Sequence, residues 1–423
     1  MVFDRHNIVY VIFLELISLA PLFILMGNVI PPFPIKIHFI AFGLIFLCSL
    51  WILVVNSSKK WALYFAALYL LLQFTLDHWS IKGFVDFFFG PFVLIILIDL
   101  LVNRRLPLAF LEKYEQRFYH LLWVPVSISI LQFFEVLPLT FWNATYVNSA
   151  FIDGVYIPRP NGFLYHGSEL SIIICFIALF QYFKKERVSF WMFIVLIFIC
   201  LATYFKAILA CVVLLFLYYL LFVNKGMLSR FKLISKARIF WYGGVLTLIG
   251  AFFALRFFSI VHDYTGYYFP PQMLTGRGGI WNIYLEGIKE FSWWNYLFGN
   301  GMGSATEIFK EYASAETFYP LTISKKLHIV YDTHNAMLSI FVNGGIIGLF
   351  FIFYIFRIIY NQIKNWSPTA EWNKKVFFGI FIIPLFTIGI TINIYEMAII
   401  WPCIGFLFYR WFISTEENER PAK

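Results

Sequence analysis

This sequence carries unusually few charged residues. Only 13% of its 423 residues are Asp, Glu, Lys or Arg, whereas soluble domains carry about 25%. Hydrophobic residues make up 61% of the chain, and the mean hydropathy is +0.78. This balance excludes an ordinary soluble enzyme and indicates an integral membrane protein. The net charge of +9 does not indicate nucleic-acid binding, because excess Lys and Arg in a membrane protein mark cytoplasmic loops.

The usual ligand sets of metals are also missing. The chain has no Asp-x-Asp pair, no HExxH motif and no His/Cys cluster. Its five cysteines lie inside apolar runs, where neither a metal site nor a disulfide is indicated: Cys48, Cys175, Cys200, Cys211 and Cys403. We therefore expect no metal and no other cofactor. A cleavable signal peptide is not expected either, because more apolar runs follow the first one.

The long apolar runs predict an all-α polytopic protein, since a bilayer core needs roughly 20 apolar residues per helix. Twelve spans are predicted: Ile8–Met26, Ile35–Val55, Trp61–Leu76, Phe84–Val102, Phe118–Leu137, Phe163–Phe183, Phe190–Tyr204, Ala207–Val223, Phe240–Val261, Asn335–Tyr360, Val376–Asn393 and Ala398–Ile413. The seventh and eighth spans meet at Tyr204–Lys206 and could form one tight hairpin.

The loops that follow even-numbered spans are basic, which places them and both termini in the cytoplasm. Four parts result: spans 1 to 9 in residues 1–258, a large outer loop in 259–334, spans 10 to 12 in 335–413 and a cytoplasmic tail in 414–423. Within the outer loop, apolar patterning predicts short helices along the membrane over Ile280–Phe291 and Ser304–Tyr312.

Basic residues on the outer side of a membrane protein call for an explanation by function or anchoring, because the positive-inside bias selects against them there. Arg159, Lys206, Arg277 and His334 are predicted at this face. Together they could bind a lipid-linked phosphate or diphosphate, with Arg as a bidentate fork and Lys as a point charge. Each could instead be a snorkelling anchor at the membrane interface.

Two glycine groups stand in the outer loop: Gly276, Gly278 and Gly279, then Gly299, Gly301 and Gly303. Glycine permits a tight backbone with positive φ. The spacing also occurs in nucleotide loops, but no strand precedes it here. We interpret the glycines as a turn that packs on the membrane domain.

Further ionisable residues lie in or near the spans. His166 and Glu169 are three apart, on one helical face, and could form a proton relay, contact a sugar hydroxyl or simply satisfy each other. Ionisable groups within spans are functional candidates by default; here they are Glu15, Asp86, Asp99, Glu135 and Glu396. Asp99 and Glu135 lie near predicted span ends, where solvation is cheap.

The run TGRGGIWNIYLEGIKEFSWWNYLFGNGMGS, followed by DTHNAMLSIFVNGGIIGLFFIFY, resembles the O-antigen ligase and O-antigen polymerase superfamily of bacterial envelopes. The resemblance is strongest over Thr275–Tyr354 and extends faintly to RPNGFLYHGSELS and TYFKAILA. It implies a multi-span glycosyltransferase similar to the C-type membrane fold. The donor would be a glycan on undecaprenyl diphosphate, used at the outer face without a metal.

The resemblance also implies roles for individual residues. Arg277 and His334 would be the motif Arg and His, and Arg159 matches an Arg before a Gly-Phe helix start. Lys206 stands where many members carry Arg, so the charge is kept and the bidentate geometry is lost. The basic groups would stabilise the diphosphate leaving group. His334 would act as base or hydrogen-bond partner for the acceptor hydroxyl, since histidine titrates near pH 6.5.

We therefore expect a polymerase of O-antigen, capsule or exopolysaccharide in the bacterial inner membrane, with its site facing the periplasm. Its partners would be lipid-linked donor and acceptor glycans and membrane lipids, and could include a chain-length regulator, but no nucleic acid. His166, Glu169 and Glu396 could contact substrate. A ligase that transfers the same donor to lipid A-core or protein fits the motifs equally well. A transporter or flippase for lipid-linked sugar is a third possibility, against which stand the asymmetric outer loop and the lack of an internal repeat.

Overall fold

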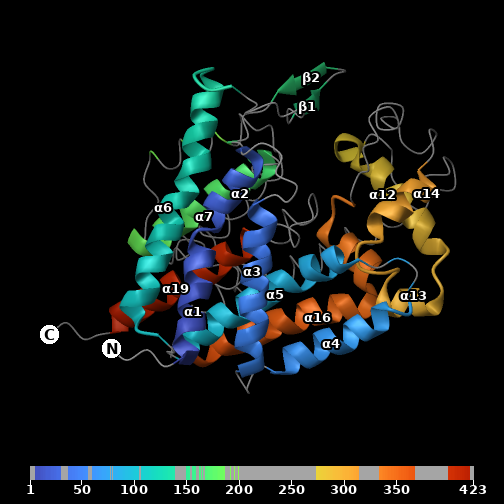
Figure 1. Cartoon of the computed structure of the whole chain (residues 1–423). Helices are drawn as coiled ribbons and strands as arrows, with labels where there is room; N and C mark the ends of the chain where they lie inside the picture. The colour runs from blue at the N-terminus through green and yellow to red at the C-terminus, as the bar shows by residue number, and fades with distance from the viewer. Residues whose placement is uncertain are drawn as a thin grey trace, which may run out of the picture.

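The structure is a computed structural model of the whole chain (Figure 1). It describes residues 5–29, 37–55, 60–76, 78, 80–103, 106–138, 149–152, 155–158, 162, 164, 167–185, 191, 195, 199, 273–313, 333–366 and 399–419. The longer elements in these ranges are α1 (Arg5–Ser18), α2 (Ala20–Val29), α3 (Ile37–Val55), α4 (Lys60–Gln73), α5 (Ile81–Val102), α6 (Leu108–Phe133), β1 (Ser149–Ile152), β2 (Val155–Pro158), α7 (Gly167–Lys185), α12 (Met273–Lys289), α13 (Trp293–Phe298), α14 (Ala305–Tyr312), α16 (Ala336–Trp366) and α19 (Ile400–Glu419).

The described helices agree with the expected membrane class. Two of them, over Ile81–Leu101 and Ala336–Ile358, are long and apolar enough to cross a membrane. A third candidate is the pair Ile40–Val55 and Lys60–Gln73, taken as one span bent by 119°. The described part of the chain thus contains apolar helices long enough to cross a membrane. The number of twelve spans stays a prediction.

The predicted spans in the described ranges fall on helices, but the first of them, Ile8–Met26, is divided between α1 and α2, which meet at Leu19, and the ends of the others differ. The predicted spans Phe190–Tyr204, Ala207–Val223, Phe240–Val261 and Val376–Asn393 lie outside these ranges, apart from residues 191, 195 and 199. The fifth span was predicted to begin at Phe118, but α6 begins at Leu108. The charged run after Leu108 resembles a loop in sequence, yet it consists of good helix formers and its apolar residues are buried against the bundle. Similarly, α19 continues to Glu419, into the predicted tail.

Helix α5 lies in the centre of the hydrophobic core and packs closely on α19. A Cβ atom added to Gly90 would overlap the indole ring of Trp401, and one added to Gly405 would overlap the side chain of Leu97. Small residues at such positions let two helices approach closely, which is the usual basis of helix association in membranes. Phe88 and Phe92 of α5 are fully buried in the same core.

A short hairpin follows α6 and was not predicted from the sequence. Strands β1 and β2 pair antiparallel, with Ser149 opposite Pro158. The chain then returns to α6, where the Gly162 amide donates to the side-chain oxygen of Gln132 at 2.9 Å. Gly162 has φ +63°, and an added Cβ would overlap the carbonyl group of Pro125. Gly162 is therefore held directly against α6.

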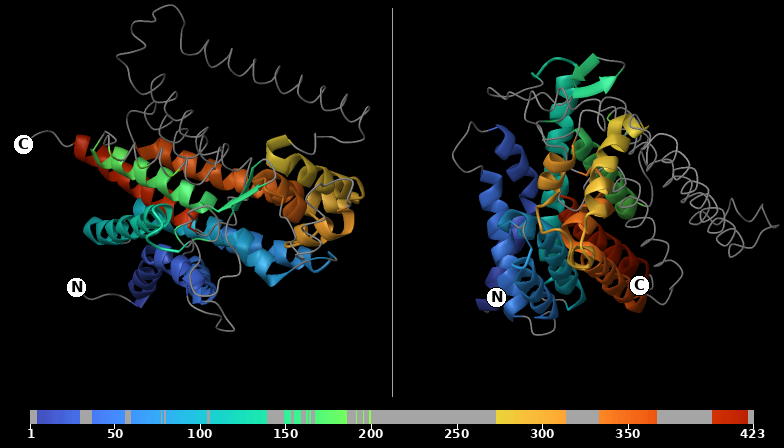
Figure 2. Two further views of the ribbon diagram at one scale, coloured as in Figure 1. Left: turned by 90° about the horizontal axis from the view of Figure 1, so that it is seen from above. Right: turned by 90° about the vertical axis from the view of Figure 1, so that its right-hand side faces the viewer.

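Helices α12, α13 and α14 gather at one end of the molecule, away from both termini (Figures 1 and 2). The two short helices predicted in the outer loop correspond to α12 and α14. A separate apolar cluster joins these helices to α16; its buried members are Ile280, Ile283, Tyr284, Ala305, Ile308, Phe309 and Val342. The Tyr284 hydroxyl also donates to the Ala305 carbonyl at 3.0 Å. The three helices thus form a packed unit on the first half of α16.

Candidate functional site

The second glycine group forms the turn between α13 and α14, as predicted. Gly299, Gly301 and Gly303 all have positive φ, between +81° and +113°. A Cβ atom on Gly299 would overlap the backbone of Asn343, and one on Gly303 would lie 2.5 Å from the hydroxyl oxygen of Ser80. Because both neighbours belong to long helices or their caps, the turn can approach them only without side chains.

The first glycine group does not behave as predicted. Gly276, Gly278 and Gly279 lie inside α12 instead of forming a tight turn with positive φ. Gly278 and Gly279 are buried. The prediction of a second glycine turn around Arg277 is therefore wrong: the backbone of this residue is helical, and the residue belongs to the first half of α12.

Helix α16 is interrupted where the glycine turn meets it. Gly345 has φ +63° and ψ −165°, so two helical segments meet at a kink. The backbone amide of Asn300 donates to the Val342 carbonyl at 2.8 Å. The Tyr69 hydroxyl of α4 donates to the carbonyl oxygens of Phe298, at 2.9 Å, and of Gly344. The carbonyl groups at the break are thus satisfied by the glycine turn and by α4, as backbone groups at membrane depth must be.

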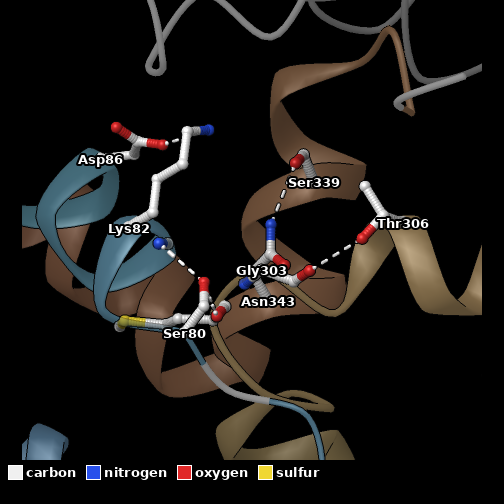
Figure 3. A network of polar contacts seen from close by, with 9 residues as sticks. Ser80, Lys82, Asp86, Gly303, Thr306, Ser339 and Asn343 are labelled. Carbon is white, nitrogen blue, oxygen red and sulfur yellow. Dashed lines mark hydrogen bonds and ion pairs between the residues drawn. The ribbon is translucent and has the colours of Figure 1, made fainter. Parts of the chain in front are cut away.

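Polar groups of α4, α16 and the residue before α5 hold the turn in place, and Figure 3 shows the contacts around Ser80 and Asn343. The Asn343 side-chain oxygen accepts from the Gly303 amide at 3.1 Å, and its nitrogen donates to the Ser339 hydroxyl at 3.2 Å. Gln73 of α4 accepts from the Met302 amide at 2.7 Å. The Ser80 amide donates to the Met302 carbonyl at 2.8 Å. This polar network fastens the outer helices to α4, α5 and α16.

His334 lies immediately before α16, in a backbone conformation uncommon for residues other than glycine. Its φ is +47°, and Glu135 is the one other such residue in the described ranges. Asn335 caps α16, because its side-chain oxygen accepts from the Leu338 amide at 3.0 Å. The Thr333 hydroxyl donates to the Asn335 carbonyl at 3.1 Å. Non-glycine residues in this region cluster at functional sites, where the surrounding structure holds them.

Helix α12 supplies the hydrogen bond that orders this segment. The Trp281 indole nitrogen donates to the Thr333 carbonyl at 3.0 Å, and both residues are buried. Arg277 precedes Trp281 by four residues and so lies on the same helical face, one turn away. The two predicted catalytic positions, Arg277 and His334, thus belong to segments in direct contact.

The remaining predicted site residues are distributed differently. Arg159, Lys206, His166 and Glu396 lie outside the described residues. Glu169 is in the first turn of α7 and is half-buried. Since α7 packs on α6 and α19, Glu169 belongs to the helical bundle and not to the α12–α14 unit. The structure therefore places Arg277 and His334 on two segments that are joined by the Trp281–Thr333 hydrogen bond, and the roles of all these residues stay predictions.

Several ionisable candidates are paired with neighbouring side chains. Glu15 of α1 accepts from the Tyr114 hydroxyl at 3.0 Å and forms an ion pair with Arg117 of α6. Asp86 forms an ion pair of 3.1 Å with Lys82, one turn earlier on α5 (Figure 3). The Glu15 contacts link α1 to α6, whereas the Asp86 ion pair joins two residues of the same helix.

Asp99 and Glu135 were both predicted to be solvated at span ends. Glu135 is exposed in the turn after α6, in agreement with that prediction. Asp99 is only 1% exposed, so the prediction is wrong for this residue. Its carboxylate accepts from the Asn103 amide at 2.5 Å, and packing of α5 at the centre of the bundle excludes water there.

A buried ion pair was missed by sequence reasoning. Arg410 of α19 donates to Glu115 of α6, with 3.1 Å between the Arg410 Nε and Glu115 Oε1 atoms. Glu115 is 3% and Arg410 6% exposed. Glu115 lies in the charged run that was read as a cytoplasmic loop, and no spacing in the sequence links it to Arg410.

Trp281, Tyr69 and Gln73 were also missed, whereas Asn343 could have been noticed as a polar residue before a glycine pair in an apolar run.

Within the described residues, no three His, Cys, Asp or Glu side chains gather where they could hold a metal ion. Comparison with protein-family models, with curated proteins and with solved structures found no match to this chain.

Proposed function

We propose that this protein is a glycosyltransferase that polymerises a bacterial surface polysaccharide of the O-antigen, capsule or exopolysaccharide kind. It would span the inner membrane twelve times in a C-type fold, with both termini in the cytoplasm and the site facing the periplasm. The observation that carries the proposal is the hydrogen bond from Trp281 to Thr333. It joins the helix that contains Arg277 to the segment that contains His334.

The proposed reaction uses two chemically different groups. The acceptor hydroxyl forms a bond to the anomeric carbon of the donor glycan, while the bond from that carbon to the undecaprenyl diphosphate oxygen breaks. The leaving diphosphate carries away negative charge, which Arg277 would stabilise together with Arg159 and Lys206. The proton of the acceptor hydroxyl would pass to His334. No cofactor is needed for this exchange.

Two observations support these separate roles for Arg277 and His334: the chemistry of the two side chains, and the contacts that hold the backbone around His334. Guanidinium groups match phosphate oxygens in a bidentate way. The segment that contains His334 is held on both sides, by Trp281 on α12 and by the Asn335 cap on α16. Catalytic groups must be fixed by their surroundings to be effective. A histidine with an ordered backbone at the start of a long apolar helix fits this requirement.

A ligase that uses the same donor shares all of these features, and a transporter is supported less. Broken helices such as α16 do occur in transporters, where the freed backbone groups bind ions or substrate. Here the carbonyls of Val342 and Gly344 at the break accept from Asn300 and Tyr69. The carbonyl groups at the break therefore bind the glycine turn and α4. This favours an enzyme whose outer unit is fixed over a transporter.

The proposal is tested by Arg277→Ala in a strain from which the gene has been deleted. We expect polymer formation to fall at least about 100-fold, the usual cost of removing one charge-stabilising donor. Arg277→Lys should recover little if the contact is bidentate. Lys289→Ala is the matched control, because Lys289 is on the same helix and pairs with Glu286 at the surface. Normal polymer from Arg277→Ala would contradict the proposal.

The same strain separates polymerase from ligase. In the deletion strain, glycan chains are analysed by gel. Single repeats still attached to the core, with no longer chains, indicate a polymerase. Loss of all attachment indicates a ligase and overturns the polymerase assignment while keeping the reaction class.

A further inference from the structure

Helix α13 carries two exposed aromatic side chains, of which Tyr296 also packs on Phe291 and Phe341 and donates its hydroxyl to the Ile288 carbonyl at 3.1 Å. Trp293 is 69% and Tyr296 37% exposed. They are three residues apart and therefore neighbours on the helix surface. The Trp293 indole meets the neighbouring Trp294 edge to face, with ring centroids 5.1 Å apart, and most of its surface stays exposed.

The exposure of Trp293 is fixed by how α13 is held. The neighbouring Trp294 donates from its indole nitrogen to the Thr75 hydroxyl at 3.3 Å and packs on Phe298, with ring centroids 4.4 Å apart. The Phe298 carbonyl accepts from Tyr69. The inward side of the helix is thus bound to α4, and Trp293 could turn inward only if these contacts broke.

The surface on one side of α13 is apolar. Tyr64, Leu68 and Leu71 form one face of α4, and Phe74 follows at its end; each is at least 59% exposed. Phe74 is adjacent in sequence to Thr75, which contacts Trp294. The apolar face of α4 therefore leads directly to α13, which lies at the end of that helix (Figure 1).

The other two helices of the outer unit carry exposed charges. Lys289 and Glu286 of α12 form an exposed ion pair of 2.8 Å, and Lys310 and Glu307 of α14 form another of the same length. Such pairs belong in water. Trp293 accordingly marks a boundary between an apolar surface and a charged one, which is where Trp and Tyr gather in membrane proteins.

We propose that α13 is an interfacial anchor whose Trp293 and Tyr296 side chains dock among phospholipids at the boundary between headgroups and acyl chains. The lipid is the occupant that the continuous apolar face of α4 favours, because that face needs hydrocarbon along its whole length. The anchor would set the depth of the glycine turn and of the α16 start relative to the headgroups. This inference does not depend on the proposed enzymatic activity.

The test is the membrane depth of single spin labels. The five native cysteines are replaced by Ala, one new Cys is introduced and labelled, and the full-length protein is reconstituted into phosphatidylethanolamine–phosphatidylglycerol vesicles. Collision rates with oxygen, which concentrates in hydrocarbon, are compared with those of a water-soluble nickel chelate. The test positions are Trp293→Cys and Tyr296→Cys, and the second variant retains Trp293. Leu68→Cys is the hydrocarbon control and Glu307→Cys the water control.

We expect both test positions to lie between the controls, at the boundary between headgroups and acyl chains where Trp and Tyr gather in membrane proteins. Labels as accessible to nickel as the one at position 307 would place α13 in water and overturn the proposal. Labels shielded from both reagents would show that protein covers α13, as a second copy or another partner, and would overturn it equally.

Discussion

The indole nitrogen of Trp281 lies 3.0 Å from the carbonyl oxygen of Thr333, the residue before His334. This hydrogen bond is buried and links two segments 52 residues apart. It connects the middle of α12 to the start of α16, where the chain passes through the positive φ of His334. The bond therefore joins the segment of the proposed acceptor-side group to the helix that contains Arg277.

Trp281→Phe should slow glycan transfer without weakening donor binding. The phenyl ring occupies only part of the buried indole site and the hydrogen bond is lost; loss of the hydrogen bond alone costs about 0.5–1.5 kcal/mol, or roughly a 2- to 10-fold change in rate. Transfer kinetics with lipid-linked substrates should show the loss in kcat, with little change in KM for the donor. Trp51→Phe, at an exposed position on α3, is the control. Equal kinetics for both variants would show that the bond does not position the site.

His334→Ala should remove transfer and leave donor binding nearly unchanged, because the charge of the diphosphate is assigned to Arg277, Arg159 and Lys206. If His334 acts as the base, the wild-type rate should fall as pH drops and the imidazole becomes protonated. Any residual activity of the variant should lack this acidic limb. Met337→Ala, an exposed position on α16, is the control. Failure of His334→Ala to bind donor would contradict the division of roles.

Activity should survive chelation of divalent metal ions. The sequence has no Asp-x-Asp pair, and no group of three metal-ligating side chains occurs in the described parts of the chain. Purified protein with lipid-linked substrate should turn over equally with and without EDTA. A strict requirement for added magnesium or manganese would reveal a carboxylate site that this reasoning has missed.

Gly299→Ala should destabilise the protein, whereas Gly43→Ala should not. Gly299 has φ +81° and touches the backbone of Asn343, while an added Cβ on Gly43 of α3 meets no atom within 4 Å. Forcing a side chain into positive φ costs about 1–3 kcal/mol before any overlap is counted. Thermal unfolding in detergent should show a lower transition temperature for Gly299→Ala only. Identical transitions in the two variants would mean that the glycine turn is not tightly packed on α16.

The sequence by itself determined the class of this protein and much of its local structure. A long apolar run without charge has few stable alternatives to a membrane helix, so α3, α4, α5 and α16 could be placed from hydropathy alone. The glycine turn at 299–303 and the helix at 305–312 were also predicted, since both depend on local residue types. The helical conformation around Gly276 was not predicted, because local glycine content favoured a turn and the packing of α12 on α14 prevailed.

Tertiary structure alone decided which distant groups meet. Tyr69 and Phe298 are 229 residues apart, and Glu115 and Arg410 are 295 apart. Hydropathy shows that a side chain lies in a helix, but it does not name the partner, because the partner depends on how the helices pack. The same holds for Trp281, which reads as one more aromatic residue among many until α12 lies against Thr333. Packing of small residues, such as Gly90 against Trp401, brings the helices close enough for these hydrogen bonds to form.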